Sequence, residues 1–229
     1  MMKRPKSDIP PDVTEVEVSE YLQQGMHVHF QEKDCILNSQ IVGRRSYDSD
    51  GNIQKETPLK NGKKHGREYI WDEMGALESV EPYRDGKLHG LAKQYNRQGK
   101  VIGTYRFVHG NGYDIWRYER EDGSIGISEI FTLKDGALNG YEWWPRDDQR
   151  SLWHERHWNQ GLPHGIERRW NQKRRLKRGY PKYWINGKAV RRRAYLKACE
   201  GDKSLPKFRE KDNLPRRKFP TDIEKLLSK

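Results

Sequence analysis

A glycine that recurs with a period of about 24 residues constrains the fold of this chain more than any other feature of its sequence. The first series is evenly spaced and comprises Gly51, Gly75, Gly99 and Gly123. A second series has nearly the same spacing and comprises Gly62, Gly86, Gly110, Gly136, Gly161 and Gly187. A third series, with a slightly more variable spacing, comprises Gly43, Gly66, Gly90, Gly112, Gly140 and Gly165. A period shared by three series indicates tandem units, each of which buries a thin face against its neighbours.

Between the glycines, apolar side chains follow a period of two, which predicts β-strands. An aromatic residue precedes the first-series glycine by four positions, at Tyr47, Trp71 and Tyr95, with Trp170 equivalent in the last unit. Apolar or aromatic residues follow that glycine by two and by eight positions, at Ile53, Leu77, Val101, Ile125, Leu59, Tyr83, Phe107 and Phe131. Their shared parity places them on one face of a sheet, so we expect residues of opposite parity to face water, including Glu68, Glu78, Gln94 and Arg106. Each unit is then a β-hairpin whose turns need glycine for positive φ.

These features predict an all-β fold of about six tandem β-hairpins with a period of about 24 residues, forming an elongated, curved antiparallel sheet over residues 43–190. Residues 1–42 are expected to be a leader and an atypical first segment. Within them, we expect residues 1–12 to be disordered, residues 20–22 to form a helical turn capped by Ser19, and residues 26–30 to form a strand.

Residues 191–229 are expected to form a cap helix and a basic, Pro-containing tail. The helix is predicted over residues 191–200, with Tyr195 and Cys199 on one stripe and Gly201 as its stop, and it would cover the open edge of the sheet. Residues 202–220 are expected to be extended. Thr221 and Glu224 have the spacing of a capping box, which predicts a short helix over residues 222–227.

The cysteine content and the hydropathy pattern indicate a cytoplasmic protein. The two cysteines, Cys35 and Cys199, make no disulfide framework, as is typical of a reducing compartment. The basic N-terminus lacks the apolar core of a signal peptide, and the chain contains no run of 18 apolar residues. We therefore expect no transmembrane segment.

Three stretches carry a resemblance to a known family: KNGKKHGREYIWDEMGAL, RDGKLHGLAKQYNRQGKV and NQGLPHGIERRW. Their G-K-x-x-G, aromatic, G-x-apolar pattern resembles the bacterial MORN-variant repeat, and looser matches extend over about residues 43–190. The resemblance implies a tandem β-hairpin repeat protein without a catalytic motif. Proteins of this type are often antitoxin-like or immunity-like, so it also implies a non-enzymatic scaffold for protein–protein interaction.

The fourth and fifth units depart from the repeat and are rich in tryptophan, which predicts contacts with a protein partner. Tryptophan is enriched in interface hot spots. The candidate contact residues are Trp116, Trp143, Trp144, Trp153 and Trp158. The alternative role for each of them is packing in the core.

The positive charge lies at the C-terminal end, which suggests a second function, nucleic-acid binding. Residues 167–229 hold 22 Lys and Arg against 7 Asp and Glu. The candidate contacts to nucleic acid or to an acidic surface are Arg168, Arg169, Arg174, Arg175, Arg191, Arg192 and Arg193. Aromatic residues that would stack on bases are Trp170, Tyr180, Tyr183 and Trp184. The alternatives are a solvated edge that keeps the sheet soluble, or contact with an acidic protein or a membrane surface.

The sequence predicts no catalytic residue, no metal site and no cofactor. Four histidines directly precede repeat or turn glycines, which favours a structural hydrogen-bonding role: His65, His89, His109 and His164. His154 and His157 are three residues apart on a predicted strand, so they point to opposite faces. The pairs Asp147–Asp148 and Glu119–Glu121 lie in or beside predicted turns. No phosphate loop, GxSxG or HExxH motif is present in the sequence.

Overall fold

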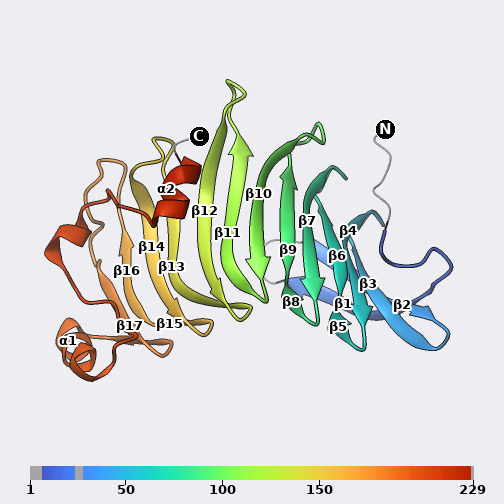
Figure 1. Cartoon of the computed structure of the whole chain (residues 1–229), viewed down its shortest axis with the longest axis horizontal. Helices are drawn as coiled ribbons and strands as arrows, with labels where there is room; N and C mark the ends of the chain where they lie inside the picture. The colour runs from blue at the N-terminus through green and yellow to red at the C-terminus, as the bar shows by residue number, and fades with distance from the viewer. Residues whose placement is uncertain (1–6, 24–27, 228–229) are drawn as a thin grey trace. The chain divides into compact units, whose positions relative to one another are not determined.

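The chain divides into two compact units, Met1–Gly110 and Asn111–Lys229, and the boundary between them lies inside the predicted repeat array. The computed structural model describes residues 7–23 and 28–227. In both units the described residues form mostly antiparallel strands with few helices (Figure 1), which confirms the predicted all-β fold of tandem hairpins. The predicted domain boundaries at residues 42/43 and 190/191 stay a prediction.

In unit 1 the strands pair in chain order, so that each hairpin lies beside the next. The antiparallel order is β1–β2–β3–β4–β6–β7–β9–β10, and the two-residue strands β5 and β8 pair with β4 and β7. The bounds are β1 Thr14–Gln23, β2 Val28–Leu37, β3 Gln40–Tyr47, β4 Ile53–Lys60, β5 Lys63–Lys64, β6 Gly66–Trp71, β7 Leu77–Arg84, β8 Lys87–Leu88, β9 Gly90–Tyr95 and β10 Val101–Val108.

Unit 2 repeats this arrangement and adds the helices. Its order is β11–β12–β13–β14–β16–β17–β18, and the short β15 pairs with β14. The strands are β11 Asn111–Glu119, β12 Ile125–Lys134, β13 Ala137–Pro145, β14 Leu152–Asn159, β15 Leu162–Pro163, β16 Gly165–Arg169, β17 Lys182–Ile185 and β18 Lys188–Val190. The helices are α1 Arg192–Gly201, the 3-10 helix η1 Glu210–Asn213, and α2 Thr221–Leu227.

The hairpin turns explain the glycine period. At the turn before β8, Asp85 and Gly86 have φ angles of 51° and 85°, and Asn186 and Gly187 repeat this with 47° and 78°. Two consecutive positive φ angles define the type I′ turn, whose twist matches that of the flanking strands. A glycine in the second position avoids the clash of a side chain with the backbone, which is why the turn glycines recur.

A register shift near the end of each hairpin overturns part of the predicted facing of the side chains. Glu68 and Gln94 were expected to face water, but both are buried. The pairing shifts by one residue between Ile70 and Trp71, as it does at the equivalent place in other hairpins. The extra residue lies on the second strand of each hairpin, as between Val101 and Gly103 in β10, and it reverses the alternation of faces there: Val101 is 43% exposed, whereas Phe107 is 1% exposed. The burial of Glu68 has another cause, because its neighbour Tyr69 in the unbulged strand β6 is buried as well, so both faces are covered at this point.

The histidines before the repeat glycines form a recurring hydrogen bond. The Nδ1 atom of His164 accepts the backbone N–H of Asn186 at 3.1 Å, and that of His89 accepts the N–H of His109 at 3.1 Å. The backbone N–H of each histidine also donates across its hairpin, to His157 and Pro82 respectively. These contacts tie one hairpin to the turn of the next, as expected for a structural role.

The N-terminal segment differs from its prediction. Residues 20–22 lie in strand β1, so the predicted helical turn is wrong. Of the predicted strand over residues 26–30, positions 26 and 27 lie outside the described residues, and the rest belongs to β2. Of the predicted disordered leader, residues 1–6 lie outside the described residues, but Ile9 is only 2% exposed. Asp8 accepts the backbone N–H of Arg67 at 2.8 Å, a contact between distant parts of the chain that local composition does not reveal.

Helix α1 matches its prediction within one residue at each end. Tyr195 is buried in a small core with Ile166, Tyr183 and Leu205, and Cys199 packs against it. The helix contacts β17. It therefore packs at the end of unit 2 near the last strands, as expected (Figure 1).

The segment after α1 packs back over unit 2 instead of extending away from it, which corrects the prediction for residues 202–220. Phe219 is buried and meets the ring of Trp143 edge-on at a centroid distance of 5.3 Å. Helix α2 lies over the middle strands of this unit (Figure 1). It forms where the capping box predicts a helix, but Glu224 accepts the backbone N–H of Phe219 at 2.7 Å, two residues earlier than the box requires.

Among the described residues, no helix is both long enough and apolar enough to span a membrane.

Candidate functional site

An open pocket of about 650 Å³ lies at one end of the strands of unit 2. It is lined by residues of β13, β14, β16 and the loop after β16: Trp144, Trp153, His154, Arg169, Trp170, Asn171, Gln172, Lys173 and Lys177. None of these nine lining residues carries a carboxylate. The pocket thus combines aromatic walls with cations, and we call it the Trp–Lys pocket.

Strand register brings three of its residues into one row. Trp144 pairs with His154, and His154 pairs with Arg169, so the three side chains lie side by side on one face of the sheet. The ring of Trp144 meets the imidazole of His154 edge-on at 4.9 Å. The floor of the pocket is therefore set by the sheet and not by a loop.

The wall at Trp153 is held by a buried arginine. The guanidinium carbon of Arg146 lies 3.3 Å from the centroid of the Trp153 ring. Arg146 also donates to the backbone oxygens of Leu152 at 3.1 Å and of Asn171 at 2.6 Å. Burial, followed by the nearby charge of Arg174, lowers the pKa of Arg146. Arg146 thus fixes one face of the Trp153 ring and joins the turn after β13 to the loop after β16.

Two polar atoms at the floor lack a hydrogen-bond partner among the described residues. They are Nε1 of Trp144 and Nδ1 of His154, and both are shielded from solvent. His154 is 4% exposed, and its other ring nitrogen, Nε2, lies 3.2 Å from the carboxylate of Glu167. Buried polar groups are nearly always paired in folded proteins, so these two atoms are exceptions. Both are closed to solvent, so neither is presented to a ligand in the open volume of the pocket.

The carboxylate behind the floor is ionised. Burial raises the pKa of Glu167, but hydrogen bonds from His154 and Arg156 outweigh it and hold the pKa at about 2. Arg156 donates to Glu167 at 3.0 Å. An ionised carboxylate only accepts hydrogen bonds, so Nε2 of His154 carries the hydrogen in this pair.

The rim of the pocket is basic. Lys173 and Lys177 are exposed, and the side chain of Arg169 is 41% exposed. Arg174 forms an ion pair with Asp148 at 2.9 Å, and Arg175 is exposed. The cations therefore surround the aromatic walls on the solvent side.

The five predicted partner-binding tryptophans do not form one patch. Trp144 and Trp153 line the pocket, whereas Trp143 is 7% exposed on the opposite face and donates to Glu155 at 3.2 Å. Trp158 is half-buried and donates to Glu142 at 2.6 Å, and Trp116 is half-buried on β11. The burial of Trp143 under Phe219 contradicts its predicted role as a contact residue, while the roles of the other four stay predictions.

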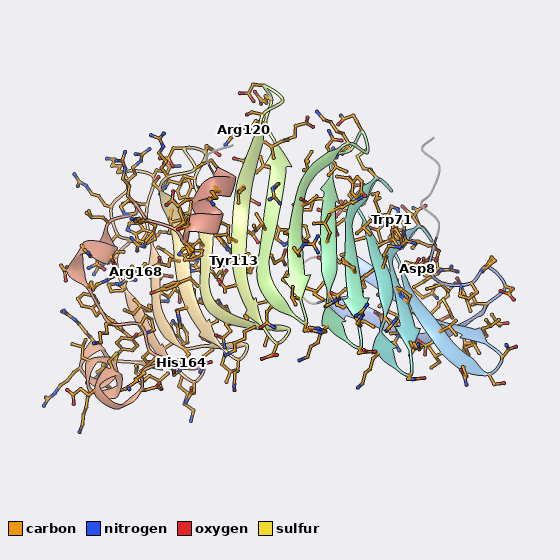
Figure 2. The ribbon with its side chains drawn as sticks, in the orientation of Figure 1. Asp8, Trp71, Tyr113, Arg120, His164 and Arg168 are labelled. Carbon is orange, nitrogen blue, oxygen red and sulfur yellow. The ribbon has the colours of Figure 1, made fainter. Side chains whose placement is uncertain are left out.

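The predicted nucleic-acid contacts also separate into groups. Arg168, labelled in Figure 2, is 1% exposed and bonds Glu155 at 2.9 Å, so its burial contradicts a surface role. Arg217 donates to the same carboxylate and anchors the C-terminal segment. The remaining candidates are exposed or half-exposed: Arg169, Arg174 and Arg175 near the pocket, and Arg191, Arg192 and Arg193 at the start of α1.

The four aromatic residues predicted to stack on bases are also only partly available. Trp170 lines the pocket, although its Nε1 donates to the backbone oxygen of Asn213 at 2.6 Å. Tyr183 is buried against α1, and Trp184 donates to Glu167 at 3.0 Å. Tyr180 lies beside Arg169 and Lys182.

Sequence reasoning missed five pocket residues, His154, Asn171, Gln172, Lys173 and Lys177. His154 was considered only as a metal ligand, and Lys173 and Lys177 were not separated from the surrounding basic run. The signal was the loop NQKRRLKRGY, which is longer than the short turns of the earlier hairpins and follows Trp170 directly. An enlarged, basic turn beside an aromatic strand end is a feature that a repeat alignment exposes.

Metal and thiol chemistry find little support in the described part of the chain. No group of three His, Cys, Asp or Glu side chains there is placed to hold a metal ion. His154 and His157 point to opposite faces, since they pair with Trp144 and Tyr141 respectively. Burial raises the pKa of Cys35 to about 11 and also raises that of Cys199, which disfavours the reactive thiolate of either residue.

Comparison with known proteins returns no match from the family models or from the curated proteins.

Proposed function

We propose that this chain is a non-enzymatic binding protein and that unit 2 binds single-stranded nucleic acid at the Trp–Lys pocket. The observation that supports the proposal is the composition of the pocket: tryptophan walls, a rim of lysine and arginine, and no carboxylate among its lining residues. Proteins that bind single strands combine these two elements, because bases stack on aromatic rings and phosphates pair with cations. The tandem hairpins would serve as the scaffold, in keeping with the MORN-variant resemblance.

The two elements contribute different kinds of free energy. Stacking of one base on an aromatic side chain is worth about 1–3 kcal/mol. Each phosphate neutralised by a cation releases counterions, and the slope of log K against log salt changes by roughly 0.7 per contact on a single strand. Affinity that combines both is therefore salt-dependent, with a remainder that persists at high salt.

The test is the binding of a fluorescent 12-nucleotide single strand, followed by anisotropy between about 50 and 200 mM salt. We expect the double variant Lys173→Ala/Lys177→Ala to weaken binding and to reduce the salt slope by roughly 1.4, the value for two lost contacts. The control Lys188→Ala/Lys203→Ala removes the same charge from exposed sites outside the pocket and should leave the slope nearly unchanged. If the two double variants had equal effects, binding would depend on the overall positive charge and not on the pocket. Absence of binding at about 50 mM salt would refute the proposal.

Deletion of residues 191–229 is a poor test, although the charge of this region makes it attractive. The deletion removes Phe219 from Trp143 and Arg217 from Glu155, so it uncovers the buried face of unit 2. Loss of binding would then report unfolding. Point substitutions at the rim avoid this problem.

A second candidate function is the protein-binding scaffold, including an antitoxin or immunity role. It is favoured by Trp153, which is 40% exposed and stacked with Arg146, since Trp and Arg are enriched in interface hot spots. The test is a pull-down from nuclease-treated native lysate with the wild-type chain and with Trp153→Ala. A protein captured by the wild type and lost by the variant supports this candidate. Capture that nuclease treatment abolishes supports nucleic acid instead.

A further inference from the structure

We propose that one base of the strand stacks on Trp153 in the Trp–Lys pocket, and that the site therefore prefers a purine at this position. The inference rests on the proposed function and names the class of base that the pocket favours. Three features support it: which tryptophan is exposed, how its ring is held, and where the cations lie.

Of the three tryptophans that line the pocket, Trp153 has the most open ring. It exposes 40% of its surface, whereas Trp170 exposes 2%. The guanidinium carbon of Arg217 also lies 5.3 Å from the centroid of the Trp170 ring. Trp144 is half-buried, and its ring meets the imidazole of His154 edge-on. The pocket thus presents one exposed stacking platform, which is enough for one base.

The ring of Trp153 is ordered before any base arrives. The guanidinium of Arg146 covers one of its two faces at 3.3 Å. Arg146 is only 8% exposed and is itself fixed by the backbone oxygens of Leu152 and Asn171. The backbone oxygen of Trp153 accepts the N–H of Trp170 at 3.0 Å, which holds the main chain. The second face of the ring is left for a base, and prior ordering lowers the entropy lost when the base stacks.

Stacking on a single indole ring predicts a preference for purines. The attraction comes from dispersion and from apolar surface removed from water, and both grow with the area of contact. A purine has two fused rings and a pyrimidine has one, so a purine covers more of Trp153. Every base has a π-face, so the site accepts all four bases and the preference is moderate. No hydrogen bond to the edge of a base is required.

The cations of the pocket belong to other residues than the stacking platform. Lys173 and Lys177 are exposed on the loop after β16, whereas Arg174 is already paired with Asp148. Lysine ammonium groups suit phosphate oxygens, and contacts to phosphate carry no information about the base. Stacking and charge can therefore be removed separately. The volume of about 650 Å³ is within the range of roughly 300–1,000 Å³ that is typical of small-ligand pockets.

The experiment compares three strands of 12 nucleotides by anisotropy at about 50 mM salt. One alternates adenine with cytosine, the second has thymine in place of every adenine, and the third is fully abasic. The wild-type chain should bind the adenine strand about 2- to 4-fold more tightly than the thymine strand. It should bind the thymine strand about 5- to 150-fold more tightly than the abasic strand.

Trp153→Ala should lose most of both preferences and bind the abasic strand as the wild type does, because the lysines remain. Trp153→Phe keeps a smaller ring and should retain part of each preference. Lys173→Ala/Lys177→Ala should weaken binding of all three strands and preserve the ratio between adenine and thymine strands. The matched control is Trp71→Ala, the same change at a half-buried tryptophan of β6 outside the pocket, which should preserve both preferences.

Thermal unfolding of each variant verifies that it is folded before binding is measured. If Trp153→Ala does not fold, Trp153→Phe and the wild-type ratios still decide the proposal. Equal binding of the adenine and thymine strands by the wild type would overturn the purine preference. Unchanged preferences in the Trp153 variants would overturn the stacking platform, and in both cases single-strand binding would stand. If no strand binds at about 50 mM salt, the proposed function fails and the stacking site fails with it.

Discussion

Two hairpin turns, one at Asp72 in unit 1 and one at Arg146 in unit 2, begin with residues of opposite charge. In unit 1 this position is Asp72, whose carboxylate accepts the backbone N–H groups of Met74 and Ala76 at 3.0 and 2.9 Å. In unit 2 the corresponding residue is Arg146, whose backbone N–H donates to the backbone oxygen of Ser151 and closes a turn that is one residue longer than the turn from Asp72 to Ala76. The turn hydrogen bonds that Asp72 supplies pass to Asp148, which accepts the N–H of Ser151 at 2.8 Å. The arginine side chain is thereby released to reach the next loop.

Buried carboxylates in the two units also have different partners. Glu81 in unit 1 accepts hydroxyl groups from Tyr105 at 3.0 Å and Tyr83 at 3.1 Å. In unit 2, Glu155 and Glu167 are bound by arginine and histidine side chains. Glu81 of unit 1 is thus bound by tyrosine hydroxyls where Glu155 and Glu167 of unit 2 are bound by cations, although unit 1 also holds the buried ion pairs of Glu56 with Arg45 and of Glu68 with Lys64. The paired charges of unit 2 anchor the C-terminal segment and set the floor of the Trp–Lys pocket.

The largest effect is expected from breaking the ion pairs beneath the C-terminal segment. Glu155→Ala leaves Arg168 and Arg217 without their shared carboxylate, and Arg168 is buried. Removing one partner of a buried pair costs about 3–5 kcal/mol, so the free energy of unfolding should fall by that amount in urea titrations. The comparison in unit 1 is Asp8→Ala, which removes a partly exposed pair with Arg67. It should cost at most about 1 kcal/mol. Equal losses would show that the C-terminal segment does not depend on Glu155.

A second test uses acid, to which two buried carboxylates, Glu167 in unit 2 and Glu81 in unit 1, should respond with opposite sign. The pKa of Glu167 is lowered from its ordinary value of 4.5 to about 2 by His154 and Arg156, which outweigh burial. Its contribution is therefore complete above pH 4.5 and is lost as the pH falls towards 2. Hydrogen bonds to a charged group contribute roughly 1.5–3 kcal/mol. We expect the stability gap between wild type and Glu167→Gln to be about 2 kcal/mol at about pH 6 and to shrink as the pH approaches about 2.

Glu81 is the matched residue in unit 1. Burial raises its pKa above 4.5, so the folded state holds the proton more tightly than the unfolded state and stability falls as the pH rises through this window. Glu81→Gln should therefore gain stability relative to wild type at about pH 6 and lose that advantage at about pH 3. The measurement is urea unfolding of both variants at several pH values. If the stability difference from the wild type changed with pH in the same direction for Glu81→Gln and Glu167→Gln, the predicted opposite responses of the two carboxylates would be wrong.

A third prediction tests the N-terminal segment against the sheet of unit 1. A methyl group at Gly43 would overlap the Cδ1 atom of Ile9, which is buried. Gly43→Ala should therefore cost about 1–3 kcal/mol in unfolding free energy, the usual cost of overpacking. The double variant Gly43→Ala/Ile9→Ala makes room for the methyl group and should cost less than the sum of the two single changes. Additive losses would show that residues 7–12 do not pack on β3.

The repeat and its turns were predictable from sequence because positive φ restricts the turn to glycine and a few polar residues, as at Asp85–Gly86 and Asn186–Gly187. Helix α1 was predictable because its period differs from that of the strands. The burial of Glu68 was not predictable from parity, since the adjacent Tyr69 is buried too and both faces of β6 are covered at this point. Local patterns also do not show contacts across long separations in sequence, such as Asp8 with Arg67.

The candidate site was predictable only in part, for a similar reason. Trp144 and Trp153 stood out because tryptophan exceeds the needs of the repeat. Their convergence on His154 depends on the pairing of β13 with β14 and of β14 with β16, which is a tertiary property. Trp143 was also predicted to contact a partner, but it is buried, in part by Phe219. This contact was not predictable because Phe219 is far from Trp143 in the sequence.

The smallest expected effect exchanges the turn residues of the two units. Arg146→Asp gives unit 2 the residue that unit 1 has at Asp72, and it removes both the stacking on Trp153 and the bonds to the loop after β16. A cation–π contact is worth about 0.5–2 kcal/mol, so affinity for a single strand should fall by about tenfold, or about 1.4 kcal/mol. Arg146→Lys retains the charge without the planar fork and should lie between wild type and the aspartate variant.

The reverse exchange, Asp72→Arg, provides the comparison. It places an arginine at the equivalent turn of unit 1, where Trp71 rather than a Trp–Lys pocket lies beside it. It should not create binding, because the lysine rim and the polar floor are absent from the residues around that turn as described. Anisotropy with the same 12-nucleotide strand measures all three variants. If Asp72→Arg raised affinity as much as Arg146→Asp lowered it, charge alone would account for binding. The pocket geometry of unit 2 would then have no special role.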